Sequence, residues 1–119
     1  MSHPDIAYKI LDAVDWDLTR ATGSYGGSAV DLADGYIHLS TAEQLRETAR
    51  RHYAGRDGLV ILDVALAPLG ATVKWEPSRG GDLFPHIYGP LPASAVRAAR
   101  RAYVEADGRL VMGEPEVSA

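Results

Sequence analysis

The sequence predicts a single α+β domain, and three observations support this fold class. The chain has 119 residues, which is enough for one hydrophobic core and too few for two. Apolar residues make up 46% of the chain and charged residues 24%, the balance of an ordinary globular protein. Short β-prone runs are interspersed with one clearly amphipathic helical segment. We expect the domain to occupy residues 1–113, followed by a frayed tail over residues 114–119.

Composition argues against several classes of function. The chain has no cysteine, so thiol chemistry and cysteine metal sites are excluded. A formal net charge of −4 makes DNA an unlikely partner, because DNA affinity comes from clustered basic charge. No segment approaches the roughly eighteen apolar residues of a membrane span, and the N-terminus lacks a signal-peptide pattern. We therefore expect no membrane partner and a cytoplasmic location.

The first third of the chain predicts a strand, a short helix and a long loop. Residues 6–11 (IAYKIL) form a short apolar run between turn-forming residues, which is typical of a strand. Residues 15–22 indicate one or two helical turns that end at Gly23. Residues 23–35 (GSYGGSAVDLADG) are rich in glycine and show little periodicity, so we expect one long loop. A loop of this length in a small domain is more often a binding segment or a lid than an idle connection.

The next segment predicts a strand that leads directly into the main helix. Residues 35–39 (GYIHL) are β-prone, and Ser40 to Glu43 have the Ser-x-x-Glu form of a capping box. From there to residue 53 the apolar side chains fall on one helical face, and Gly55 follows as a stop signal. The expected helix covers about residues 41–53.

The remainder of the chain predicts mostly strands. Residues 59–66 (LVILDVAL) are the most apolar segment and predict the central strand, and residues 72–76 alternate as a half-buried strand does. Residues 83–91 (LFPHIYGPL) hold two prolines, which favours a short strand at a sheet edge. Residues 93–106 fit a helix by their alanines and a strand by their alternation. Residues 110–112 predict a final strand.

His38 is the first candidate for chemistry. It stands in a predicted strand just before a helix start, where backbone N–H groups favour anions such as phosphate. The alternative is a partly buried histidine with one satisfied hydrogen bond. Ser40 and Thr41 could assist at the helix start, although a role as helix caps already explains both hydroxyls.

His86 is the second candidate. Pro85 and the segment Tyr88-Gly89-Pro90 restrict the backbone around an imidazole and a phenol, which is the rigidity that a catalytic or binding group needs. A structural proline-rich turn is the alternative. Trp75 and Glu76 offer a stacking surface beside a carboxylate, or else a core tryptophan and a solvated glutamate. The histidines and Glu76 do not have the spacing of a metal-binding motif, so we expect no metal site.

Three segments together resemble a known family. They are YKI at residues 8–10, DGYIHLST at residues 34–41 and KWEPSRGGDLFPHIYGPL at residues 74–91. In order and spacing they are similar to the bacterial proteins grouped as domain of unknown function 952 (DUF952), over most of the chain. That family in turn resembles, more distantly, the ADP-ribosyltransferases and the RNA 2′-phosphotransferases that also consume NAD.

The resemblance implies a curved, mostly antiparallel split β-sheet, with a nucleotide in a cleft between two small sheets. It favours a strand for residues 96–104. The implied site residues come from the first strand, from a strand that leads into a helix, and from a later edge strand; they are Tyr8 or Lys9, then His38 with Ser40 and Thr41, then the segment 84–91. Protein-modifying transferases of this fold usually have a glutamate at the third position, where this chain has His86. A histidine there is closer to the phosphotransferase pattern.

We hypothesise that the protein is an NAD- or ADP-ribose-directed transferase with a nucleotide-like ligand. The residues do not identify a cofactor, and the resemblance implies NAD. The expected catalytic residues are His38 and His86, and the expected ligand-binding residues are Lys9, Tyr8, Ser40, Thr41, Trp75, Glu76 and Tyr88. Two alternatives stay open, a non-catalytic metabolite-binding module and a protein-interaction domain. The sequence determines neither the oligomeric state nor whether the two histidines face one cavity.

Overall fold

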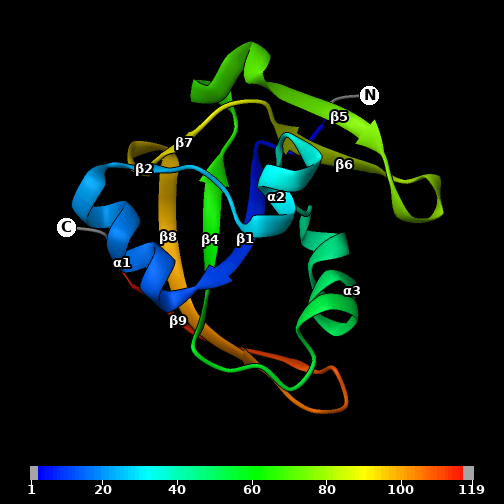
Figure 1. The fold of residues 1–119 in the computed structure, drawn as a ribbon. Helices are drawn as coiled ribbons and strands as arrows, with labels where there is room; N and C mark the ends of the chain where they lie inside the picture. Colours follow the sequence, from blue (N-terminus) through cyan, green and yellow to red (C-terminus); the bar gives the residue numbers. More distant parts are fainter. Residues whose placement is uncertain (1–2, 117–119) are drawn as a thin grey trace.

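A computed structural model describes residues 3–116 of the chain, which within that range forms nine strands, three α-helices and three 3₁₀ segments. The strands are β1 (Ile6–Asp12), β2 (Ser24–Tyr25), β3 (Ile37–His38), β4 (Leu59–Ala65), β5 (Val73–Pro77), β6 (Leu83–Ile87), β7 (Leu91–Pro92), β8 (Val96–Val104) and β9 (Leu110–Glu116). The helices are α1 (Ala13–Thr22), α2 (Ala29–Asp34) and α3 (Ala42–Tyr53), and the 3₁₀ segments are Ala67–Thr72, Arg79–Gly81 and Ala93–Ala95. Figure 1 shows these elements in chain order.

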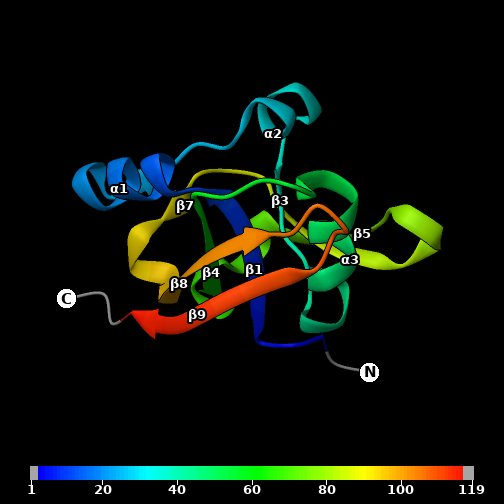
Figure 2. The same cartoon turned by 90° about the horizontal axis from the view of Figure 1, so that it is seen from below.

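The larger sheet has four antiparallel strands in the order β1-β4-β8-β9 and is apolar on both faces. Because side chains alternate along a strand, Val60 and Leu62 of β4 enter one cluster while Leu59 and Ile61 enter the other. Trp16 of α1 belongs to the first cluster. Helix α3 contributes two side chains, Leu45 and Ala49, to the second. The views in Figures 1 and 2 place α1 and α3 at well-separated parts of this sheet.

The smaller sheet has three antiparallel strands in the order β3-β6-β5, and β2 pairs with β7 as a separate ribbon. Ile37 and Ile87 point into the first apolar cluster, so one face of this sheet is buried. An isolated antiparallel bridge between Tyr8 and Ser40 links the larger sheet to the segment that follows β3. The protein is therefore an α+β domain with antiparallel sheets and few helices.

Several predicted elements are confirmed. Strands β1, β4 and β5 and helix α3 lie within one or two residues of their predicted limits, and α1 begins two residues earlier than expected. The segment that fits both a helix and a strand is the strand β8. Strand β9 continues past Met112 to Glu116, so residues 114–116 pair with β8 rather than fray. Residues 117–119 of the expected tail lie outside the described residues.

The prediction of one long loop over residues 23–35 is wrong, because this segment contains β2 and α2. The six-residue helix α2 has its own capping box. The Ser28 side chain accepts a hydrogen bond from the Asp31 backbone, and the Asp31 carboxylate accepts one from the Ser28 backbone. Gly35 ends the helix with a φ of 90°, a conformation that favours glycine. A helix this short is not stable by itself, and the tertiary contacts of Asp31 stabilise it.

Two local predictions also need correction. Strand β6 lies between β3 and β5 rather than at an edge; Pro85 lacks an N–H but offers its carbonyl to the Leu39 backbone at 3.0 Å. The capping box of α3 begins at Thr41, not Ser40. Thr41 and Gln44 exchange side-chain to backbone hydrogen bonds at 3.0 and 3.3 Å, while the Ser40 hydroxyl lies 3.0 Å from that of Thr48.

Candidate functional site

The face of the smaller sheet that points away from the apolar cluster carries a row of polar side chains. In the antiparallel register His38 of β3 lies opposite His86 of β6, and His86 lies opposite Lys74 of β5. Directly opposite residues point to the same face, so the three side chains are cross-strand neighbours. The two imidazole centroids are 5.4 Å apart. The alternation that buries Ile37 and Ile87 thus brings both predicted catalytic residues together on the other face.

His86 is buried and held by a carboxylate. Its Nδ1 lies 2.7 Å from Oε1 of Glu76, and the Tyr88 hydroxyl donates a hydrogen bond of 2.7 Å to the same oxygen. Hydrogen bonds from His86 and then Tyr88 hold the pKa of Glu76 below its usual value, and the bond to Glu76 raises the pKa of Tyr88 to about 12. An ionised carboxylate only accepts, so Nδ1 carries a proton and Nε2 is left for the cavity. Among residues 3–116 Nε2 has no hydrogen-bond partner.

The imidazole of His38 is bound at both nitrogens. Nδ1 lies 2.6 Å from Oδ1 of Asp31, and Nε2 lies 2.9 Å from Oδ2 of Asp34. When both carboxylates accept at once, both ring nitrogens must donate, and the ring is then an imidazolium. The two histidines therefore have different surroundings: both ring nitrogens of His38 face carboxylates, whereas Nε2 of His86 has no hydrogen-bond partner among residues 3–116.

Asp31 is the centre of the buried part of the site. Its carboxylate accepts four hydrogen bonds, from Lys9 Nζ at 2.8 Å, the Ser28 backbone at 2.9 Å, the His38 backbone at 3.1 Å and His38 Nδ1 at 2.6 Å. Burial alone would raise the pKa of Asp31, but the hydrogen bonds from His38 and Lys9 outweigh it and hold this pKa well below its usual range. Burial also lowers the pKa of Lys9, against the attraction of Asp31. Four hydrogen bonds stabilise the ionised carboxylate of Asp31, so Lys9 and Asp31 form a buried ion pair.

A cavity of about 950 Å³ runs between β1, α2, β6 and α3. Its volume lies within the range of small-molecule sites. Both histidines line it, together with three more of the sequence-predicted residues, Tyr8, Lys9 and Ser40. The sequence left open whether His38 and His86 share one cavity, and here they do.

Four predicted ligand-binding residues are not among those that line this cavity. Glu76 and Tyr88 act on it indirectly, through their contacts with His86. Thr41 is the buried cap of α3. Trp75 packs against the apolar core, and its ring stacks on His3 with centroids 4.0 Å apart, so it is not placed to stack on a ligand beside the histidines.

Sequence reasoning missed three residues that complete the site. Asp31 and Asp34 lay in the segment expected to be a loop. The signal for Asp31 was the Ser28-x-x-Asp31 capping spacing, and Asp34 is the first residue of the DGYIHLST motif. Tyr36 stacks on His86 at 4.1 Å and lies 4.7 Å from the His38 ring. Its position two residues before His38 in a β-prone run was the available signal, because it places both rings on one face.

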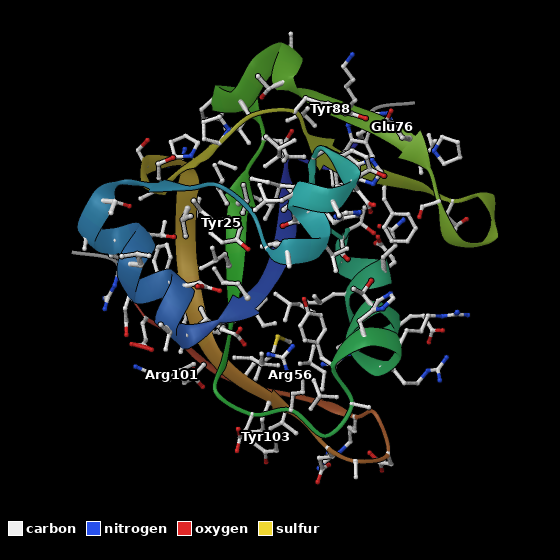
Figure 3. All side chains as sticks on the ribbon, in the orientation of Figure 1. Tyr25, Arg56, Glu76, Tyr88, Arg101 and Tyr103 are labelled. Carbon is white, nitrogen blue, oxygen red and sulfur yellow. The ribbon has the colours of Figure 1, made fainter. Side chains whose placement is uncertain are left out.

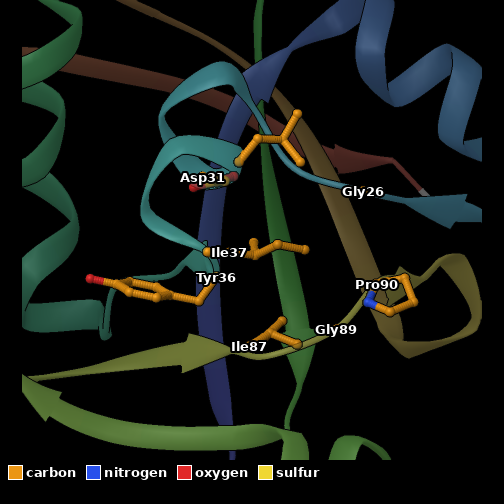
Figure 4. Close-up of a pocket in the computed structure, with 9 residues that line it drawn as sticks. Gly26, Asp31, Tyr36, Ile37, Ile87, Gly89 and Pro90 are labelled. Carbon is orange, nitrogen blue, oxygen red and sulfur yellow. The ribbon is translucent and has the colours of Figure 1, made fainter.

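A smaller pocket of about 290 Å³ lies next to the cavity, and Asp31 lines both. Figure 4 shows it beside α2, with Ile37, Ile87 and Pro90 around it and Tyr36 pointing the opposite way from Ile37. Its lining is largely apolar, with Asp31 and Tyr36 the exceptions. Helix α2 therefore separates a polar cavity from an apolar pocket.

Within the described range 3–116, no group of three or more His, Asp or Glu side chains is arranged to hold a metal ion. In the same part of the chain no helix is both long and apolar enough to cross a membrane.

The family described as "Protein of unknown function (DUF952)" matches residues 10–99. The crystal structure of protein CC0527 from Caulobacter crescentus is similar, with 49% identity, a TM-score of 0.84, and coverage of 89% of this chain and 93% of that one. The solution NMR structure of CC0527 gives 49% identity and a TM-score of 0.78, with 89% and 91% of the two chains covered. No curated protein matches the chain.

Proposed function

The chain belongs to the DUF952 family, and from this premise we propose that it is a transferase that binds NAD or an ADP-ribose nucleotide in the large cavity. The observation that supports this most is the pair of histidines in one cavity, cross-strand neighbours with different hydrogen-bond partners. One imidazole suits charge stabilisation and the other suits proton transfer, and a group transfer from a nucleotide needs both.

In this proposal His86 is the general base. Glu76 holds its Nδ1 proton, so Nε2 is the nitrogen that accepts a proton from the acceptor hydroxyl. The bond between ribose C1′ and the nicotinamide nitrogen breaks, and its electron pair leaves with neutral nicotinamide. The acceptor oxygen then forms the new bond to C1′, and its proton resides on His86. Glu76 is a positioning residue, because it acts through His86.

His38 has the complementary role. Its ring lies between the carboxylates of Asp31 and Asp34, and in the proposal its protonated form supplies a fixed positive charge beside the reacting sugar. Such a charge attracts a phosphate or a ribose oxygen without the reorganisation that solvent would need. Protein-modifying transferases of that fold usually have a glutamate at the third position, where this chain has His86. In the proposal Glu76 on the neighbouring strand β5, whose carboxylate reaches His86, takes the place of that glutamate.

The distant resemblance of the sequence to ADP-ribosyltransferases supports the same proposal. In that fold the site residues come from the first strand, from a strand that leads into a helix, and from a later strand beside a cleft between two sheets. In this chain β1 supplies Tyr8 and Lys9, the segment after β3 supplies Ser40, and β6 supplies His86 to the cavity wall.

One observation favours a second candidate, a non-catalytic nucleotide sensor. Both nitrogens of His38 are already bound to carboxylates, which suits a residue that holds a ligand more than one that exchanges protons with it. Turnover separates the candidates, because an enzyme releases nicotinamide and a sensor shows saturable binding alone.

The test combines binding with turnover. Isotopically labelled protein is titrated with NAD and ADP-ribose while the imidazole and amide signals of His38 and His86 are followed by NMR, and nicotinamide release is assayed. His86→Asn keeps an amide N–H near the Nδ1 position for Glu76 but removes Nε2. We expect it to bind ADP-ribose like wild type and to release nicotinamide at least about a hundredfold more slowly.

His3→Asn is the matched control, because His3 stacks on Trp75 and is not among the cavity-lining residues. It should leave both binding and turnover unchanged. If neither nucleotide shifts the histidine signals at millimolar concentration, the proposed function is wrong. Binding with no nicotinamide release in wild type would favour the sensor.

A further inference from the structure

We propose that the α3 wall of the cavity is an anion subsite in which Arg51 binds phosphate groups of the ligand. The identity of the ligand as a nucleotide rests on the proposed function, whereas the subsite itself rests on the chemistry of the wall. Two adjacent turns of α3 are involved, since Thr48, Arg51 and His52 line the cavity, and Arg56 lines it just beyond the helix.

The first argument is the length of the cavity. Helix α3 starts directly after the β3 segment that carries His38, and Arg51 is ten residues beyond the N-cap Thr41. At 1.5 Å per residue this is about 15 Å along the helix axis. In Figure 3 Arg56 is labelled well below Glu76 and Tyr88. A ligand that fills the cavity is therefore elongated and has two chemically different ends.

The second argument is the charge left over on Arg51. The Glu47 carboxylate accepts two hydrogen bonds from Arg50, at 2.8 and 2.6 Å, and one from Nε of Arg51 at 2.8 Å. One negative charge is shared by two guanidinium groups, so the cluster keeps a net positive charge. Among the described residues both terminal nitrogens of Arg51 lack a partner, and a planar fork of N–H donors suits phosphate oxygens.

Arg56 does not supply the same excess of positive charge. Its guanidinium forms an ion pair with Asp12 and lies 5.2 Å from the centre of the Tyr53 ring. Both contacts occupy it, so it helps to shape the wall while Arg51 provides the free charge. The arrangement orients the ligand, with its phosphates at Arg51 and its reacting sugar at His38 and His86.

Basic residues in the last turns of a helix also stabilise the helix dipole without any ligand. The chain offers a matched control for this alternative. Arg50 precedes Arg51 on the same turn, pairs with the same Glu47, and has a side chain exposed to a similar degree, 54% against 49%. Arg50 is not among the cavity-lining residues. Removing either arginine lowers the local charge by one, but only Arg51 faces the cavity.

The experiment titrates the full-length wild type, Arg51→Gln and Arg50→Gln with inorganic pyrophosphate and, separately, with ADP-ribose. Binding is followed by calorimetry and by the amide shifts of Thr48, Arg51 and His52. We expect Arg51→Gln to weaken pyrophosphate binding about tenfold, which is the loss of one charge-assisted contact. Arg50→Gln should change it by less than about twofold. Adenosine, which lacks phosphate, should bind both variants equally.

The outcomes separate this inference from the proposed function. Equal losses in the two variants, or no saturable pyrophosphate binding, would overturn the subsite even if ADP-ribose shifts the histidine signals. Pyrophosphate binding that depends on Arg51, without NAD binding or nicotinamide release, would uphold the subsite and reject the NAD-directed transferase in favour of another phosphorylated ligand.

Discussion

The two main sheets of this protein have opposite surface chemistry. The four-stranded sheet is apolar on both faces and contributes to both hydrophobic clusters. The three-stranded sheet is apolar on one face only, and its other face carries His38 and His86. The comparison indicates that the larger sheet mainly stabilises the fold, whereas the smaller sheet carries the two histidines of the candidate site. The buried ion pair of Lys9 and Asp31 links the two sheets, because Lys9 lies on β1 of the larger sheet and Asp31 binds His38 of the smaller one.

The substitution Asp31→Asn is expected to have the largest effect, because it breaks the link between the two regions. It leaves the Lys9 amine buried opposite a neutral amide, and removing one partner of a buried ion pair costs about 3–5 kcal/mol of unfolding free energy. Urea denaturation measures the loss. A double variant, Lys9→Met with Asp31→Leu, should recover part of it, since two apolar side chains leave no buried charge. A loss of less than about 1 kcal/mol for Asp31→Asn would contradict the buried pair.

Leu62→Ala tests the larger sheet alone. Leu62 is fully buried in the interior strand β4, so truncation should cost about 3 kcal/mol through lost burial and a cavity. Ligand-induced shifts of His86 in the folded fraction should stay as in wild type, because His86 lies on the other sheet. Val30→Ala, at an exposed position of α2, is the control and should change stability by less than about 0.5 kcal/mol. Loss of the His86 shifts in Leu62→Ala would show that the two sheets are not independent.

Acid tests the same contact without a mutation, because it protonates Asp31 in the unfolded chain before it protonates Asp31 in the folded protein. The pKa of Asp31 is lowered in the folded protein, so its contribution to stability is complete above the unfolded pKa of about 3.9 and is lost as the pH falls below it. The difference in unfolding free energy between wild type and Asp31→Asn should therefore narrow, by up to about 1.4 kcal/mol per pH unit below pH 4. Urea midpoints at pH 7, 4 and 3 measure this. A difference that stays constant down to pH 3 would mean that Asp31 is not held as an anion.

The smallest effect concerns Tyr88 at the outer edge of the site. Its pKa of about 12 reflects the hydrogen bond to Glu76, so Glu76→Gln should lower this pKa toward 10, with little change in unfolding free energy. Ultraviolet titration of the tyrosines, with Tyr88→Phe to identify the signal, measures the shift. An unchanged titration in Glu76→Gln would exclude the Tyr88–Glu76 contact and weaken the assignment of Glu76 as the residue that orients His86.

Sequence reasoning was most successful where local pattern decides structure. The apolar run of residues 59–66 and the amphipathic residues 41–53 each match one element, because burial on a sheet or on one helical face leaves a periodic trace. Helix α2 leaves almost no periodic pattern in the sequence. Its key residue Asp31 is stabilised by Lys9, twenty-two positions away in the chain, and a contact of that kind cannot be inferred from spacing.

The site was predicted in part for the same reason. His38 stood out because it lies in a β-prone run just before a helix start, and His86 because prolines restrict the backbone around it. The register then makes them neighbours. Trp75 was misplaced because alternation along β5 assigns it to the core face, whereas its neighbour Glu76 points to the histidines. Knowing which face of β5 is buried requires the pairing of β5 with β6, which is a property of the folded chain.

The bridge between Tyr8 and Ser40 is a place where the structure can open locally. Two backbone hydrogen bonds, of 2.7 and 2.9 Å, close the seam between β1 and the segment after β3. Each is worth about 1 kcal/mol net, well below the free energy of global unfolding. The seam can therefore open locally while the larger sheet stays intact, and the amides of Tyr8 and Ser40 should exchange with solvent deuterium faster than that of Ile61. Tyr8 and Ser40 both line the cavity, so the largest ligand it admits should depend on this local opening as well as on the resting volume.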